Sequence, residues 1–337
     1  MVLYHRCVTP RYSFVVPVYN EEETLAELTR RLEGVLERLD GAAEVIVVDD
    51  GSVDGTPGLL QALHRRDPRF KVITFTRNFG HQLAVTAGLD RASGEATIVL
   101  DGDLQDPPEL ALDLIERWRE GYEIVYAIRA DRRREPFLRR TVIRLVYRLL
   151  HRLADVELPP DAGDFRLVDR RALDQFRQMR ESSRYVRGLF AWTGFRQIGV
   201  PYTRDARYAG RTKYPLSKLI TLGVDGLIGF SRAPLRIAVV LGFLVSLGSF
   251  VFGLAEIGLR LAGVGVVPGW ASVIVVMTFL GGVQLIVTGM VGTYVGRIYE
   301  EVKARPLYVV REAQGFESEL LAIPVAARVS GPPTVPR

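Results

Sequence analysis

Cysteine is nearly absent, because Cys7 is the single cysteine in a chain of 337 residues. One cysteine excludes an internal disulfide framework, as expected of a protein from a reducing compartment. The N-terminus lacks the charged, apolar and small-residue regions of a signal peptide, so we expect no secretory leader. The sequence also contains no repeat of a fixed period.

Two nucleotide-binding fingerprints are missing as well. The first apolar, β-rich run is not followed by G-x-G-x-x-G, and no G-x-x-x-x-G-K-[ST] occurs anywhere in the sequence. The first pattern is typical of dinucleotide-binding folds and the second of P-loop NTPases. Neither class of protein is therefore supported.

Charge is abundant and unevenly distributed. The formal net charge is +5 and the sequence pI is about 9.4. Such a basic balance favours an anionic partner: nucleic acid, a phosphorylated ligand or a membrane surface. Charged residues crowd before Arg236, whereas two long apolar runs follow it. A length of 337 residues allows one sizeable domain and additional structural elements beside it.

The N-terminal part alternates between β-rich and helical patterns. Apolar runs predict strands, and leucines at helical spacing predict amphipathic helices. Strands are expected at residues 12–18, 44–48, 71–75 and 97–100, and helices at 21–39, 56–65 and 83–92. This alternation implies right-handed crossovers and a mostly parallel sheet. We therefore predict an α/β domain of the nucleotide-binding type.

Acidic side chains follow three of the expected strands. Glu21 and Asp50 follow the first two strands, and Asp101 and Asp103 follow the fourth. An open α/β sheet binds ligands at the carboxyl ends of its strands. Oxygen ligands of this kind suit Mg²⁺ or Mn²⁺ together with substrate phosphates. The alternatives are a solvated acidic turn for the last pair and a helix cap for Asp50.

Two apolar runs towards the C-terminus are long enough to cross a bilayer. Residues 237–255 and 270–296 carry no charge, and a membrane span needs about 20 residues. Arg260 is the one basic residue of the connection, whereas several arginines and lysines flank the outer ends. The positive-inside rule then places both chain ends in the cytoplasm. Buried helices of a soluble protein are the alternative.

Two further segments suit a membrane surface. Residues 139–153 have one arginine per helical turn beside an apolar face, which predicts a basic helix on an anionic membrane or a plain solvated helix. In residues 204–231, Leu216, Leu219 and Leu227 share a helical face, which predicts an interfacial helix. The end of the chain after Gln314 is expected to be disordered.

With these features in order, the chain closely resembles the family 2 glycosyltransferases that act on polyprenyl phosphates. It is most similar to their polyprenyl-phosphate glucosyltransferase branch, which is related to dolichyl-phosphate mannose synthases. The resemblance extends from residue 12 to residue 310. It is carried by P-V-Y-N-E (17–21), D-D-G-S-x-D (49–54), R-N-F-G-H-Q (77–82), D-G-D-L-Q-D-P-P-E (101–109), G-D-F-R-L-x-D-R (163–170), R-Y-A-G-R-T-K-Y (207–214) and G-R-I-Y-E-E-V-K-x-R-P-L-Y (296–308).

The resemblance implies a GT-A domain that inverts the sugar's configuration, followed by membrane-associated helices. The expected domains are a cytoplasmic GT-A domain (1–210), a juxtamembrane amphipathic segment (211–233), a transmembrane hairpin (234–300, spans 237–259 and 270–296) and a cytoplasmic tail (301–337). One departure is Gly102, where the family more often has alanine. That change is small and should leave the metal site intact.

Roles for individual side chains also follow from the resemblance. The base, ribose and diphosphate of the donor are expected at Pro17, Tyr19, Glu21, Asp50, Asp101 and Gly102. Phosphates of donor or acceptor are expected at Arg129, Arg207 and Lys213. Asp103 and Gln105 fall where the family binds Mg²⁺ or Mn²⁺. Asp103 is therefore expected to be a catalytic residue as well.

Asp164 matches the position proposed for a catalytic base, although two roles stay open for it. An acceptor phosphate loses its second proton near pH 6, so the nucleophile is largely ionised at neutral pH. Asp164 is then expected to orient the acceptor or the sugar more than to remove a proton. A carboxylate that merely caps a helix or lies in a loop is the structural alternative.

The resemblance implies transfer of one sugar, glucose from UDP-glucose, to a polyprenyl phosphate such as undecaprenyl phosphate at the cytoplasmic face of the inner membrane. Alternatives are a GDP-mannose-dependent mannose synthase, another UDP-sugar donor, or a non-catalytic lipid-binding scaffold. A processive synthase is disfavoured because no Q-x-x-R-W motif is found. Expected partners are the nucleotide sugar, the polyprenyl phosphate, membrane lipids and further copies of the chain, a tetramer by resemblance. Nucleic acid is not expected.

Overall fold

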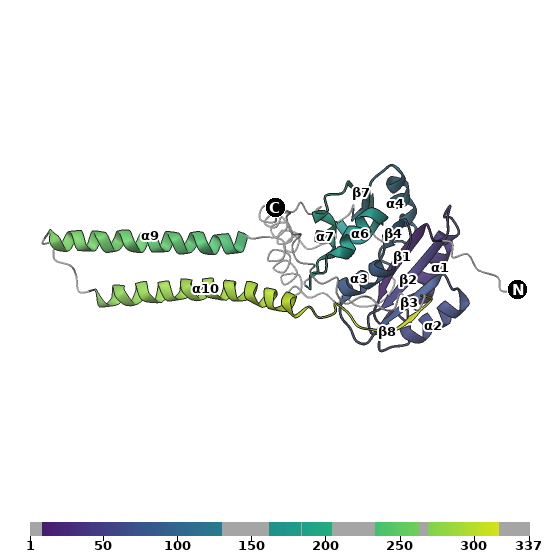
Figure 1. Ribbon diagram of the computed structural model, residues 1–337, viewed down its shortest axis with the longest axis horizontal. Coiled ribbons are helices and arrows are strands. Elements are labelled where there is room, and N and C mark those ends of the chain that lie inside the picture. The colour runs from purple at the N-terminus through teal and green to yellow at the C-terminus, as the bar shows by residue number, and fades with distance from the viewer. Residues whose placement is uncertain (1–8, 130–161, 183, 204–232, 263–268, 317–337) are drawn as a thin grey trace, which may run out of the picture. The chain divides into compact units, whose positions relative to one another are not determined.

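The computed structural model describes residues 9–129, 162–182, 184–203, 233–262 and 269–316, in two compact units. The elements of the first unit are β1 (Tyr12–Val18), α1 (Leu25–Leu36), β2 (Ala43–Asp49), α2 (Thr56–Arg66), β3 (Phe70–Phe75), α3 (His81–Arg91), β4 (Ala96–Val99), α4 (Leu110–Arg119), β5 (Ile124–Arg129), β6 (Ala162–Asp169), α6 (Arg170–Gln178), α7 (Val186–Trp192), β7 (Gln197–Tyr202) and β8 (Val310–Gln314). The second unit contains α9 (Ala233–Leu261) and α10 (Trp270–Lys303). Figure 1 shows both units.

Within the described residues, eight strands form one mixed sheet in the order β7-β5-β6-β4-β1-β2-β3-β8. β4, β1, β2 and β3 are parallel neighbours, as the alternating sequence predicts. β6 runs antiparallel to both β4 and β5, and β8 runs antiparallel to β3. The α/β class with a mostly parallel sheet is thus confirmed. The antiparallel strands have no counterpart among the strands expected from the sequence.

Helices cover both faces of this sheet. The leucines of α1 pack with side chains from α2 and α4 on one face, where Leu28 and Phe14 are buried. α3 packs against β1 and β2 on the other face, beside α6. A Cβ on Gly88 of α3 would lie 2.2 Å from Val15 Cγ1, so glycine permits this close approach to β1. Every residue of β1 is buried, which fits a central strand covered on both sides.

The first helix is shorter than its leucine spacing predicts. Residues 21–39 are the expected helix, but α1 begins at Leu25 and ends at Leu36. The backbone carbonyl of Glu21 accepts a hydrogen bond from Thr24 N at 3.1 Å, and its carboxylate accepts one from Thr24 Oγ1 at 2.9 Å. Residues 21–24 therefore form a turn that keeps Glu21 at the end of β1.

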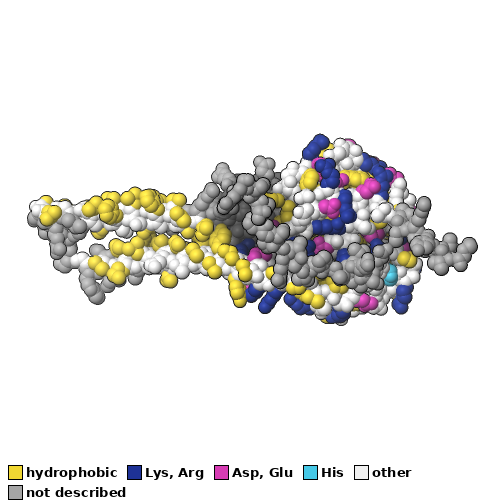
Figure 2. Space-filling model, in the orientation of Figure 1, with side chains coloured by type: hydrophobic (Ala, Val, Ile, Leu, Met, Phe, Trp, Pro, Cys, Tyr) yellow, Lys and Arg dark blue, Asp and Glu magenta, His cyan; other side chains and the backbone are white. Residues whose placement is uncertain are grey.

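The two apolar runs form long helices that lie side by side (Figure 1). Candidate membrane spans within them are Ala238–Ala255 and Val275–Lys303. A helix in the core of a soluble protein would hide its side chains, yet 6% and 0% of these stretches are buried. Figure 2 shows hydrophobic side chains covering both helices. By length, composition and exposure, both helices could cross a membrane.

Several predictions concern residues that the structure leaves undescribed. The basic helix at 139–153, the interfacial segment at 204–231 and the C-terminal end from residue 317 lie outside the described residues. So do Arg207 and Lys213, two of the three cations expected to contact phosphates. The last strand, β8, comes from the stretch that the sequence assigns to a C-terminal tail, but it pairs with β3 in the sheet.

Candidate active site

The ends of β1, β2 and β4 bring three sequence motifs together at one edge of the sheet. Asn20 N donates to Ser52 Oγ at 2.9 Å, and Glu21 N donates to Thr56 Oγ1 at 3.0 Å. The first bond joins the P-V-Y-N-E and D-D-G-S motifs, and the second ties Glu21 to the start of α2. Parallel neighbouring strands end at the same edge, which explains why distant segments meet here.

Tyr19 and Pro17 occupy different environments at this edge. Tyr19 follows β1 with 38% of its surface exposed, so its ring is available to a ligand. Pro17 lies inside β1, in register with Val48 of β2. Its carbonyl oxygen lies 3.2 Å from where a Cβ on Gly102 would stand, and that Cβ would also be 2.9 Å from Val18 Cγ1. The small residue at position 102 therefore fits tightly against β1.

Asp50 organises the turn before α3. Its buried carboxylate accepts hydrogen bonds from Phe79 N at 2.7 Å and from Gly80 N at 2.9 Å. Burial raises the pKa of Asp50 and Asp49 adds to this effect, whereas the two amide donors oppose it. Gly80 has φ +103°, a backbone conformation that glycine adopts without strain. One side chain of the D-D-G-S motif thus fixes the entry to α3.

Asp101, Gly102 and Asp103 form a tight turn after β4. Asp103 Oδ1 accepts a hydrogen bond from Gln105 N at 3.1 Å, which closes the turn. Leu104 takes a positive φ of 57° within it. The side chain of Gln105 is buried, and its amide nitrogen has no hydrogen-bond partner among the residues described. The predicted metal residues therefore lie in one short loop.

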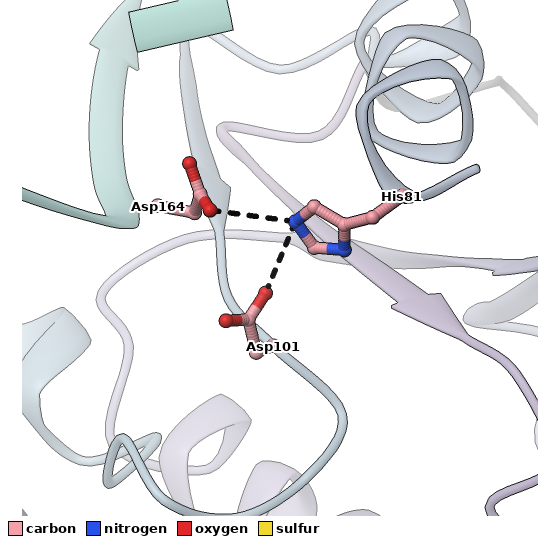
Figure 3. Close-up of side chains that lie close together, drawn as sticks. All are labelled: His81, Asp101 and Asp164. Carbon is pink, nitrogen blue, oxygen red and sulfur yellow. Dashed lines mark ion pairs between the residues drawn. The ribbon is translucent and has the colours of Figure 1, made fainter. Parts of the chain in front are cut away.

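Asp164 meets Asp101 because β6 runs antiparallel to β4. Val99 of β4 pairs with Arg166 of β6, so continuing that register brings residue 101 opposite residue 164. His81, at the start of α3, lies between the two carboxylates (Figure 3). Its Nε2 is 3.5 Å from Asp101 Oδ1 and 3.5 Å from Asp164 Oδ2. One imidazole thus bridges the ends of two antiparallel strands.

Arg187 holds Asp164 from the other side. Its Nε donates to Asp164 Oδ1 at 2.7 Å and its Nη2 donates to Oδ2 at 2.8 Å. Arg187 lies in the first turn of α7, which is fixed in place because Val186 N donates to Gln82 Oε1 at 3.0 Å. Bidentate pairing of this kind fixes the plane of a carboxylate. The orientation of Asp164 is therefore determined by side chains from α3 and α7.

The pKa values of these groups are strongly perturbed. Burial lowers the pKa of His81, but Asp101 and Asp164 outweigh this effect and raise it to about 9. Burial raises the pKa of Asp101 to about 6, with Asp164 adding to this effect and His81 opposing it. Burial also acts to raise the pKa of Asp164, but Arg187 and His81 bring it well below the usual range. Asp164 is therefore ionised at neutral pH.

The raised pKa of His81 predicts a pH dependence of stability. Its folded pKa of about 9 exceeds the unfolded value of roughly 6.5, so protonation contributes stability fully below about pH 6.5, and this contribution is lost as the pH rises through 9. We expect the melting temperature of the chain to fall between about pH 7 and about pH 9.5, and to fall less in His81→Gln. His64→Gln in α2 is the control. If the melting temperatures of the parent, His81→Gln and His64→Gln fall equally steeply with pH, the raised pKa of His81 is contradicted.

The acidic residues of the site fit a divalent cation. Asp101 Oδ1 is buried and has no hydrogen-bond partner among the described residues, and Asp103 and Asp106 contribute to the raised pKa of Asp101. Several carboxylates gathered around this buried oxygen suit Mg²⁺ or Mn²⁺, even though His81 Nε2 lies 3.5 Å from it. Ligand atoms of His81, Asp101 and Asp164 also lie within 4.8 Å of one another. In this second set, Arg187 pairs with both oxygens of Asp164.

The remaining predicted residue, Arg129, lies at the end of β5, in register with Tyr202 of β7. No hydrogen bond or ion pair described in the structure links Arg129 to the acidic cluster. Two residues at the centre of the site, His81 and Arg187, have no role that the sequence indicates. The R-N-F-G-H-Q motif, which places a histidine at the start of a helix, could have indicated His81. Arg187 stands outside every motif quoted above.

Comparison with known proteins identifies the family of this chain. A family model described as Glycosyl transferase family 2 matches residues 13–177. The glycosyltransferase YkcC of Bacillus subtilis is 45% identical over 92% of this chain and 96% of its own. The SfII prophage-derived bactoprenol glucosyl transferase of Shigella flexneri is 38% identical over 90% of this chain and 98% of its own. A prophage bactoprenol glucosyl transferase homolog of Escherichia coli K12 is 36% identical over 90% and 99%. The chain belongs to glycosyl transferase family 2 and is a glycosyltransferase.

Proposed function

We propose that this chain transfers glucose from UDP-glucose to a polyprenyl phosphate of the undecaprenyl type. The supporting observation is its similarity, over about nine-tenths of both chains, to relatives named bactoprenol glucosyl transferases. A lipid acceptor suits a chain with two helices long and apolar enough to cross a membrane. The acidic cluster at the carboxyl edge of the sheet suits a nucleotide diphosphate donor with its metal ion.

The donor occupies the edge formed by the ends of β1, β2 and β4. Tyr19 and Glu21 contact the base and ribose, together with Pro17 and Asp50, which shape the pocket. Asp50 already accepts bonds from the amides of Phe79 and Gly80, so it acts on the base with its remaining lone pairs. Asp101 and Gly102 face the ribose and the diphosphate.

Asp103, supported by Asp101 and Gln105, holds the divalent cation. Bound there, Mg²⁺ or Mn²⁺ supplies positive charge to the diphosphate as the bond to the sugar breaks. The protein contributes the turn closed by Asp103 Oδ1 and Gln105 N, which fixes the carboxylate. Arg129, Arg207 and Lys213 supply further positive charge to phosphates, since cationic side chains stabilise such groups during transfer.

The acceptor phosphate approaches on the side of Asp164. At neutral pH a phosphomonoester is largely a dianion, so its oxygen attacks the anomeric carbon while UDP leaves with the electron pair of the broken bond. Asp164 is already ionised and clamped by Arg187. A carboxylate with such a low pKa is a weak base. Asp164 therefore orients the sugar or acceptor, and His81 keeps the spacing between Asp164 and Asp101.

The same function implies a location. The catalytic domain and both chain ends lie on the cytoplasmic face of the inner membrane, because basic residues flank the outer ends of α9 and α10 whereas Arg260 lies towards the connection. Membrane lipids then surround the two helices. A homo-oligomer is also predicted, namely the tetramer that the resemblance implies.

A donor panel tests the proposal. Purified full-length protein in lipid nanodiscs with undecaprenyl phosphate and Mg²⁺ receives UDP-glucose, UDP-galactose, UDP-N-acetylglucosamine or GDP-mannose. We expect a lipid-linked glucose product, and free UDP in equal amount, with UDP-glucose preferred. Preference for GDP-mannose would identify a mannose synthase instead. Absence of product with every donor, from protein that binds no nucleotide, would favour the lipid-binding scaffold.

A further inference from the structure

The chain that follows the second long helix returns to the catalytic domain. α10 ends at Lys303, and β8, five residues long, pairs antiparallel with β3 at the edge of the sheet. Tyr308 lies between the two elements in the sequence and is only 7% exposed. A buried aromatic residue at a sheet edge must pack on the domain, so its contacts are informative.

Tyr308 joins the end of β3 to the end of α3. Its ring stacks on Phe75 with centroids 5.1 Å apart and planes inclined by 17°. Its hydroxyl donates to Asp90 Oδ2 at 2.8 Å, and Arg180 Nη1 pairs with Asp90 Oδ1 at 2.8 Å. The phenol is therefore fixed at both its face and its polar end.

The residues around Tyr308 also hold the turn between β3 and α3, residues 76–80. Thr76 N donates to Val309 O at 3.1 Å, and Arg311 Nη2 donates to Thr76 O at 2.9 Å. Phe79 packs edge-on against Phe75, the ring on which Tyr308 stacks, with centroids 5.5 Å apart. Both the beginning of the turn and its aromatic side chain thus depend on the segment that follows α10.

The far end of the same turn reaches the candidate active site. Phe79 N and Gly80 N donate to Asp50, and the next residue, His81, lies 3.5 Å from carboxylate oxygens of Asp101 and Asp164. A shift of the turn would therefore move groups at both the nucleotide end and the acceptor end of the site.

We propose that Tyr308 is a positioning residue for sugar transfer, which acts through Phe75 and the turn at residues 76–80. The inference rests on the proposed function in one respect, namely that Asp50 lines the donor site and that His81 keeps the spacing between Asp101 and Asp164. Misplacing reacting groups by about 1 Å costs up to about 10²-fold in rate. Loss of the Tyr308 contacts therefore affects donor binding and turnover far from the substituted atom.

A matched pair of aromatic residues provides the test. Trp118 in α4 also donates to a carboxylate at 2.8 Å, to Asp169 Oδ2, and also packs on an aromatic ring, Tyr12. α4 contacts β5, β6 and β7, towards the opposite edge of the sheet from β8. Substituting Trp118 thus removes comparable contacts without touching the turn.

The experiment compares full-length Tyr308→Ala and Tyr308→Phe with Trp118→Ala and Trp118→Phe. Calorimetry measures UDP binding, steady-state rates give KM for donor and acceptor, and hydrogen exchange follows a peptide covering residues 76–80. We expect Tyr308→Ala to lose on the order of tenfold in kcat/KM for the donor and to exchange faster in that peptide. Tyr308→Phe keeps the ring that stacks on Phe75, so it should retain more of the donor kcat/KM than Tyr308→Ala.

The outcomes separate the two proposals. If Tyr308→Ala matches Trp118→Ala in UDP affinity, donor kcat/KM and exchange of the turn, the positioning role is overturned. An equal loss in both alanine variants, with equal falls in melting temperature, would mean ordinary destabilisation and would also overturn it. Failure of the parent protein to transfer any sugar would instead refute the proposed function, and UDP binding and exchange would still test Tyr308.

Discussion

Asp103→Asn should abolish sugar transfer while leaving the fold nearly intact. Asparagine has the same shape and keeps an oxygen that can accept the hydrogen bond from Gln105 N, which closes the turn at 3.1 Å in the parent. It lacks the negative charge that a divalent cation requires from this loop. We expect turnover to fall by at least about 10²–10³-fold, the size typical of removing one preorganised electrostatic contact at a transition state.

Initial rates at saturating UDP-glucose and acceptor, with either Mg²⁺ or Mn²⁺, measure this loss. Asp113→Asn makes the same substitution at an exposed position in the first turn of α4 and should keep parental activity. The parent protein should lose activity in EDTA and regain it with either metal. Undiminished transfer in chelator, or in Asp103→Asn with an unchanged melting temperature, would refute the metal role.

The sequence predicts the parallel half of the sheet well because local patterns determine it. The run from Tyr12 to Val18 and the stretch around Val45 are mostly apolar, as strands buried on both faces require. β8 could not be found in this way. Its five residues, V-R-E-A-Q, are short and largely polar, and they form a strand because β3 presents an open edge.

The site was predictable where neighbouring parallel strands create it. Glu21, Asp50 and Asp101 each follow a strand directly, so their common edge follows from the topology. Asp164 could be assigned only through resemblance, because its place beside Asp101 depends on the antiparallel register of β6 with β4. Arg187 was missed for a related reason. It reaches Asp164 through tertiary contacts of α7, which leave no periodic signal in the sequence.

Asp164→Asn separates two mechanisms for the acceptor step. If Asp164 is an essential general base, the variant should lose about 10²–10⁴-fold at every pH. The structure argues against that role, because Arg187 and His81 bring the pKa of Asp164 well below its usual range. A carboxylate that stays ionised and paired holds a proton poorly. Orientation of the sugar or the acceptor is the role that we expect.

If Asp164 only orients the sugar or the acceptor, Asp164→Asn keeps measurable turnover. Asparagine preserves the shape of the side chain and one oxygen that can accept a hydrogen bond. Its rate should still rise as the pH passes through roughly 6, following the second ionisation of the acceptor phosphate. Arg207→Ala and Lys213→Ala should then be more harmful than Asp164→Asn, since they remove charge that holds phosphates. A pH–rate series at saturating acceptor decides the matter. No detectable turnover at any pH, with UDP affinity unchanged, would mean that Asp164 removes a proton and that its pairing with Arg187 breaks when substrates bind.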